Sequence, residues 1–103
     1  MIIHVKSYDE FKNLIASSDC FVDFFATWCG PCKMLTPVIE EMDEKGAFGD
    51  VKILKIDVDE VGPLAARFGI QAIPTLILFK DGQQVDKRMG YQNMNQLLAF
   101  INQ

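Results

Sequence analysis

Residues 24–33 read FFATWCGPCK, so an apolar segment is followed by two cysteines, Cys29 and Cys32, three positions apart. Pro31 suits the first turn of a helix, where its missing N–H is no loss, and the cysteines are therefore predicted to lie where a strand passes into a helix. Residues three apart there share a face, and their Cα atoms can fall within the roughly 4.4–6.8 Å that a disulfide tolerates. The pair can thus alternate between dithiol and disulfide, and the helix N-terminus favours a nucleophilic thiolate at Cys29.

Two other interpretations of this pair are a structural disulfide and half of a zinc site. A disulfide that closes a four-residue loop stabilises a fold by only roughly 2 kcal/mol on the chain-entropy model. Structural zinc takes four ligands, and beyond the pair the chain offers only Cys20 and its single histidine, His4, which we expect to be an ordinary strand residue. A C-x-x-C pair near a βαβ pattern favours redox chemistry, and we expect no metal.

The composition indicates one compact domain. The chain has 103 residues, 50% hydrophobic and 23% charged, and residues 1–103 are predicted to form a single domain. Its net charge of −4 argues against nucleic acid or an anionic membrane as the main partner. No apolar run reaches the length of a membrane-spanning helix, nothing marks the start for secretion, and three cysteines do not suit a secreted disulfide scaffold. We expect a cytoplasmic protein.

The rest of the chain alternates between strand and helix patterns. Strands are expected at 2–5, 20–26, 51–58, 76–80 and 83–89, and helices at 8–17, 31–45, 60–68 and from 93 onward. Asp59 is predicted to cap the short third helix, and Asp81-Gly82 to form a two-residue hairpin turn. The order β-α-β-α-β-α-β-β-α predicts an α/β layered domain around a mixed sheet.

Asp23 stands in the almost unbroken apolar run 20–26, which is typical of a central strand covered on both faces. Burial there disfavours the ionised carboxylate and raises its pKa. One interpretation is a carboxylate satisfied by nearby polar groups or water. The other is a proton acceptor behind the dithiol, because this strand leads straight to Cys29. Cys20 is interpreted as a small buried apolar residue, with a regulatory thiol as the alternative.

The sequence WCGPCK from Trp28 to Lys33 resembles the thioredoxin family, and the resemblance extends over essentially the whole chain. Further shared features, in order, are Asp23, Pro37, Ile73-Pro74-Thr75, Asp81-Gly82 and Gly90. The resemblance implies the thioredoxin fold, with a central mixed five-stranded sheet flanked by four helices.

The resemblance also implies an activity, that of a protein-disulfide reductase. Cys29 would attack a substrate disulfide and Cys32 would resolve the mixed disulfide, so that the oxidised protein carries a Cys29–Cys32 disulfide. Asp23 would accept the Cys32 proton. Gly30 and Pro31, between the cysteines, would tune the redox couple, and this pair resembles that of reducing members of the fold rather than oxidants or isomerases.

A substrate surface is implied beside the dithiol. Trp28, Ile73, Pro74 and Gly90 would line a shallow apolar docking surface, with Pro74 following a cis peptide bond. We expect Trp28 to be partly exposed because the motif must be reachable; the alternative is ordinary core packing. A binding module that uses the patch around Trp28 is the competing function.

The resemblance implies no bound cofactor. The chain has no nucleotide-binding glycine loop, so its electrons would come from NADPH through a thioredoxin reductase, and its other partners would be disulfide-containing proteins. A monomer is expected. Many bacterial relatives carry a lysine near the buried aspartate; that position is matched here to Ile53, so Asp23 is expected to lack this charge partner.

Overall fold

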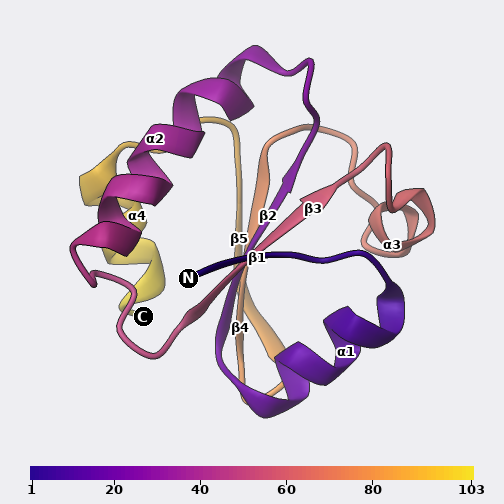
Figure 1. The fold of residues 1–103 in the computed structure, drawn as a ribbon, viewed down its shortest axis with the longest axis horizontal. Coiled ribbons are helices and arrows are strands. Elements are labelled where there is room, and N and C mark those ends of the chain that lie inside the picture. Colours follow the sequence, from indigo (N-terminus) through magenta and orange to yellow (C-terminus); the bar gives the residue numbers. More distant parts are fainter.

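The computed structural model describes residues 1–103 as one five-stranded sheet covered by helices on both faces (Figure 1). The elements are β1 (Ile2–His4), α1 (Tyr8–Ser17), β2 (Cys20–Phe25), α2 (Gly30–Glu44), β3 (Lys52–Asp57), α3 (Gly62–Arg67), β4 (Thr75–Lys80), β5 (Gln83–Met89) and α4 (Met94–Ile101). No helix is long and apolar enough to cross a membrane. The predicted order of elements is confirmed.

The sheet is mixed, with the strand order β1-β3-β2-β4-β5. β3 pairs in parallel with both β1 and β2, whereas β4 is antiparallel to β2 and β5 is antiparallel to β4. The central position therefore falls to β2, the strand that leads into the cysteine pair.

Two apolar cores lie on either side of the sheet. Helices α1 and α3 cover one face and α2 and α4 the other (Figure 1). Side chains alternate along a strand. Val22 and Phe24 of β2 accordingly enter the α1/α3 core, while Phe21 enters the α2/α4 core. Asp23 has the same parity as Phe21 and thus points toward α2.

Helix α2 begins at the cysteine pair and continues without a break through Pro37 to Glu44. A proline inside a helix costs about 3 kcal/mol. Burial of Leu35, Ile39 and Met42 in the α2/α4 core keeps the helix together across that position. The start of α2 is thereby held against the carboxyl end of β2.

The prediction that Asp59 caps α3 is wrong. The N-cap is Val61, which makes no side-chain capping hydrogen bond. Asp57 organises the preceding turn instead, because its Oδ1 accepts from the backbone N–H groups of Asp59 at 2.9 Å and Glu60 at 3.4 Å. Asp59 is thus left free to make a tertiary contact.

Candidate active site

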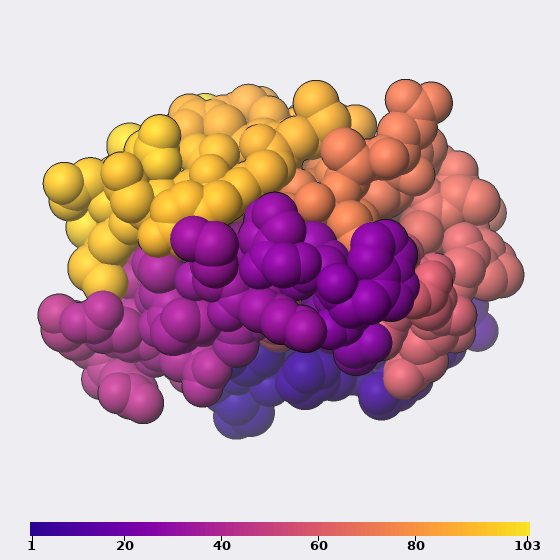
Figure 2. All heavy atoms as spheres, turned by 90° about the horizontal axis from the view of Figure 1, so that it is seen from above, coloured from indigo at the N-terminus to yellow at the C-terminus, as the bar shows by residue number.

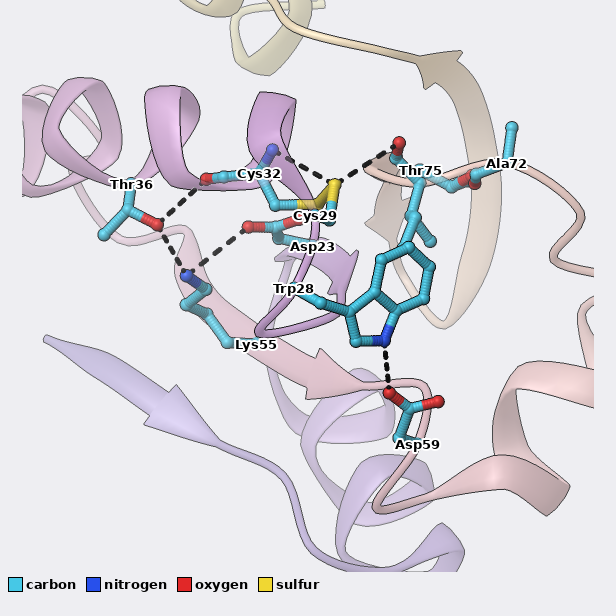
Figure 3. The surroundings of a disulfide bond; sticks show 10 residues. Asp23, Trp28, Cys29, Cys32, Thr36, Lys55, Asp59, Ala72 and Thr75 are labelled. Carbon is cyan, nitrogen blue, oxygen red and sulfur yellow. Dashed lines mark hydrogen bonds and ion pairs between the residues drawn. A yellow bond between two sulfur atoms is a disulfide. The ribbon is translucent and has the colours of Figure 1, made fainter.

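Cys29 and Cys32 are joined by a disulfide where β2 passes into α2 (Figure 3). Their Cα atoms are 5.3 Å apart, and their side chains are 5% and 3% exposed. Cys29 is the N-cap of α2, and its Sγ accepts a hydrogen bond from the Cys32 N–H at 3.2 Å. A donor already aimed at Sγ stabilises the thiolate once the disulfide opens.

The segment before β4 lies beside the disulfide. The Ile73–Pro74 peptide bond is cis, as the resemblance implies. Cys29 Sγ lies 3.7 Å from the Ile73 carbonyl oxygen, and the Gly90 N–H donates to the Pro74 carbonyl at 2.8 Å. Figure 2 views this end of the molecule, where the start of α2 (purple), the loop before β4 (orange) and the segment after β5 (yellow-orange) adjoin one another.

Trp28 is 67% exposed at this surface, as expected. Its Nε1–H donates to Asp59 Oδ2 at 2.8 Å, a contact drawn in Figure 3. The hydrogen bond holds the indole next to the cysteine pair while leaving most of the ring open to solvent. Asp59, which the sequence pattern predicted as the cap of α3, is thus a residue of the site.

Asp23 has a charge partner, and the expectation based on Ile53 is wrong. In the parallel register of β2 and β3, Ile53 lies opposite Phe21, while Lys55 lies opposite Asp23. Ile53 and Lys55 are two residues apart in β3, so their side chains project from the same face of the sheet. The expectation therefore placed the residue opposite Asp23 two positions too early in the strand. Lys55 Nζ lies 3.8 Å from Asp23 Oδ2, and both side chains are buried.

Desolvation dominates the electrostatics of Asp23. Burial raises its pKa from 3.8 to about 6, and the nearby Lys55 ammonium offsets only part of that rise. A separation of 3.8 Å is too long for a hydrogen bond to Oδ2, and Oδ1 has no hydrogen-bond partner. The predicted direction of the pKa is confirmed, because the buried carboxyl of Asp23 keeps its proton to a higher pH than an exposed aspartate does.

Lys55 is held mainly by groups other than Asp23. Its Nζ donates to Thr36 Oγ1 at 3.2 Å and lies 4.4 Å from the centre of the Phe25 ring. Thr36 Oγ1 in turn donates to the Cys32 carbonyl at 3.1 Å. A cavity of about 210 Å³ opens beside these groups; its lining residues are Phe25, Ala26, Thr27, Cys32, Lys33, Thr36 and Lys55.

Cys20 lies apart from the site, at the opposite end of β2 from Cys29. It is fully buried, and its Sγ donates to the carbonyls of Ser18 at 3.4 Å and Leu14 at 3.6 Å. Burial raises the pKa of this thiol to about 11. These properties support the interpretation of Cys20 as a small buried residue. Nowhere do three or more His, Cys, Asp or Glu side chains gather as metal ligands would.

Comparison with known proteins gives a consistent result. The family model described as Thioredoxin matches residues 2–103. The thioredoxin of Chlamydia muridarum is 46% identical over 101 residues, which cover 98% of this chain and 97% of the relative. The thioredoxin of Staphylococcus saprophyticus is 50% identical over 99 residues, which cover 94% of this chain and 93% of the relative.

Solved structures agree with these relatives. Malassezia sympodialis thioredoxin superposes with a TM-score of 0.89 at 40% identity, and the match covers 98% of this chain and 90% of that one. The oxidized form of mitochondrial thioredoxin 3 from Saccharomyces cerevisiae superposes with a TM-score of 0.88 at 39% identity, covering 98% and 93%. The fold predicted from the resemblance is confirmed.

Proposed function

Because this chain belongs to the thioredoxin family of thiol–disulfide oxidoreductases, we propose that it is a cytoplasmic electron carrier that reduces disulfides in other proteins. The observation that carries the proposal is the bridged pair Cys29–Cys32, whose Cα atoms lie 5.3 Å apart at a helix N-terminus. Opening this bridge takes up two electrons, and closing it releases them.

The first step is attack by Cys29. Its thiolate bonds to one sulfur of the substrate disulfide, the substrate S–S bond breaks, and the other substrate sulfur leaves as a thiolate. The Cys32 N–H, 3.2 Å from Cys29 Sγ, and the positive end of α2 favour the anionic nucleophile. The product is a mixed disulfide between Cys29 and the substrate.

The second step is resolution by Cys32. Its sulfur bonds to Cys29 Sγ, the mixed disulfide breaks, and the second substrate sulfur leaves, so the substrate gains two electrons and the carrier becomes the disulfide. Cys32 must first lose its proton, and Asp23 is the proposed acceptor. The support is its burial behind the pair and a pKa raised to about 6, close to the operating pH that general-base catalysis requires.

Substrate binding is assigned to the surface around the pair. Trp28, Ile73, Pro74 and Gly90 are proposed to hold an extended substrate segment. The support is the large exposed fraction of Trp28, the contact of the Ile73 carbonyl with Cys29, and the hydrogen bond from Gly90 to Pro74. Gly30 leaves open space where a side chain would project. Together with Pro31 it is proposed to tune the redox couple by controlling access and geometry between the cysteines.

The carrier is proposed to work as a monomeric single domain, residues 1–103, with no cofactor of its own. A two-electron carrier must be recharged, and a thioredoxin reductase using NADPH is the proposed source. Disulfide-containing proteins are the proposed acceptors.

Reduction of insulin disulfides by dithiothreitol tests the proposal. The wild type is expected to accelerate the reaction, and Cys29→Ser to abolish the acceleration. Cys20→Ser is the matched control, because it makes the same substitution at a thiol outside the site, and it is expected to retain the wild-type rate. An undiminished rate in Cys29→Ser would remove Cys29 from the mechanism.

A further inference from the structure

Thr36 connects the second cysteine to the buried lysine. It lies one helical turn after Cys32, and its hydroxyl donates to the Cys32 carbonyl at 3.1 Å. A hydroxyl has one proton and two lone pairs, so with its proton engaged it meets Lys55 Nζ, 3.2 Å away, as an acceptor. Figure 3 shows the continuous series of contacts from Cys32 through Thr36 and Lys55 to Asp23.

Lys55 Nζ therefore has two neighbours that compete for it. Thr36 Oγ1 lies at hydrogen-bond distance, whereas Asp23 Oδ2 lies at 3.8 Å. The lysine side chain is 9% exposed, and a buried ammonium moves to whatever acceptors surround it. Without the Thr36 hydroxyl, the nearest charged acceptor for Nζ is the Asp23 carboxylate, whose Oδ2 lies 3.8 Å away and whose Oδ1 has no hydrogen-bond partner.

We propose that Thr36 is a positioning residue, whose hydroxyl holds Lys55 Nζ back from Asp23 and so preserves the strength of Asp23 as a base. The inference rests on the proposed role of Asp23 as acceptor of the Cys32 proton. A direct hydrogen bond from Lys55 would stabilise the carboxylate and weaken it as a proton acceptor. A lysine held at 3.8 Å stabilises it less.

Few other groups act on Asp23. From β3 the charged neighbour is Lys55, and Figure 3 shows the side chains of Cys29 and Cys32 near Asp23 at the start of α2. From β4 the residue opposite Asp23 is Leu76, which carries no charge. The two cysteines do not titrate while they form a disulfide. In the oxidised protein, the titration of Asp23 therefore reports on Lys55 and on what positions it.

The test compares Thr36→Val, which keeps the side-chain shape and removes the hydroxyl, with Thr36→Ser, which keeps the hydroxyl. The Asp23 carboxyl is titrated by ¹³C NMR in each oxidised protein. Thr36→Val is expected to lower the pKa of Asp23 by about one unit, and Thr36→Ser to leave it at the wild-type value. An unchanged or raised pKa in Thr36→Val overturns the proposal.

A second variant and a kinetic measurement cover the case in which Thr36→Val does not fold or Asp23 is not the base. Thr36→Ala replaces Thr36→Val if the valine variant fails to fold, with the same expected shift. The acid limb of the pH profile for resolution of a mixed disulfide at Cys29 is expected to move with the pKa of Asp23. If Asp23→Asn leaves that rate unchanged, the catalytic role of Asp23 fails, whereas the NMR titration still decides whether Thr36 positions Lys55.

Discussion

Asp23 on β2 lies directly opposite Lys55 on β3, yet their charged atoms stop 3.8 Å apart and share no hydrogen bond. The pair is buried, and removing either charge alters the environment of the other. At Asp23 the cost of desolvation exceeds the attraction to Lys55, so the ionised carboxylate destabilises the folded state.

Replacing Asp23 with Asn is expected to stabilise the oxidised protein at neutral pH. A carboxyl whose folded pKa is raised from 3.8 to about 6 incurs no penalty below pH 4, a growing one between those values and a constant one above. Asn resembles the neutral carboxyl, so the gain should approach about 3 kcal/mol at pH 7–8 and vanish at pH 3–4. Urea unfolding across this range measures it.

Asp50→Asn is the control for that experiment, because Asp50 lies exposed in a turn. It is expected to change the free energy of unfolding by less than about 0.5 kcal/mol. A midpoint that falls in Asp23→Asn at pH 7–8 would contradict a destabilising buried carboxylate.

Removing the charge of Lys55 is expected to move the pKa of Asp23 upward. Lys55→Met keeps an unbranched side chain but eliminates the only charge that opposes desolvation, so the pKa should rise above 6. The measurement is the carboxyl titration in the oxidised protein. Lys52→Met, at the exposed start of the same strand, should leave that titration unchanged. A lower pKa in Lys55→Met would show that another group governs Asp23.

The two cysteines are expected to behave differently when each is replaced by serine. Cys32→Ser should accumulate a mixed disulfide with a disulfide-containing peptide, because Cys29 attacks and nothing resolves the product. Cys29→Ser should accumulate far less, because Cys29 is the N-cap whose Sγ accepts the Cys32 N–H, whereas Cys32 lies inside the first turn without such a donor to stabilise its thiolate. Intact mass spectrometry counts the adducts, and equal yields would reverse the assigned roles.

Trp28 is expected to contribute to the binding of protein substrates but not to the reaction with small disulfides. Trp28→Ala should raise KM for a protein disulfide by about tenfold, the scale of a lost aromatic contact, and leave reaction with a small aromatic disulfide unchanged. Because the ring is 67% exposed, the free energy of unfolding should change little. Equal losses with both substrates would indicate damage to the cysteine pair and not to a docking surface.

Cys20 is expected to resist alkylation in the folded, reduced protein. Its side chain is fully buried, and burial raises its pKa to about 11, so the thiolate is scarce at pH 7.5. Iodoacetamide should label Cys29 first, and Cys20 only after denaturation, as peptide mass mapping would show. Prompt labelling of Cys20 in the native protein would favour the regulatory alternative.

The fold follows from strong local signals. The apolar run that became β2 is covered on both faces, and Asp81 and Gly82 adopt the positive φ values, 53° and 76°, that a two-residue hairpin turn requires. These features depend on neighbours in the chain. That dependence explains why the order of elements and the hairpin between β4 and β5 could be predicted from the residues themselves.

The rest of the site depends on register and on tertiary contacts. Whether Asp23 meets Ile53 or Lys55 is decided by how β3 slides against β2, and a shift of two residues leaves the same face of the sheet buried. Thr36 contacts Lys55 only because the orientation of α2 about its axis turns this side chain toward β3. Asp59 was predicted to cap α3, but its carboxylate instead accepts a hydrogen bond from the indole N–H of Trp28. None of these has a local sequence signature.

The burial of the third thiol at the far end of β2 limits disulfide formation within one chain to a single bridge. With β2 rising about 3.3 Å per residue, Cys20 is out of reach of the Cys29–Cys32 bridge, so no internal shuffling to a mispaired isomer competes with it. A coulometric titration should consume two electrons per chain and follow a single Nernst curve. Under the proposed function, each chain would therefore pass on its reducing equivalents two at a time, because one disulfide is the only oxidised form within reach.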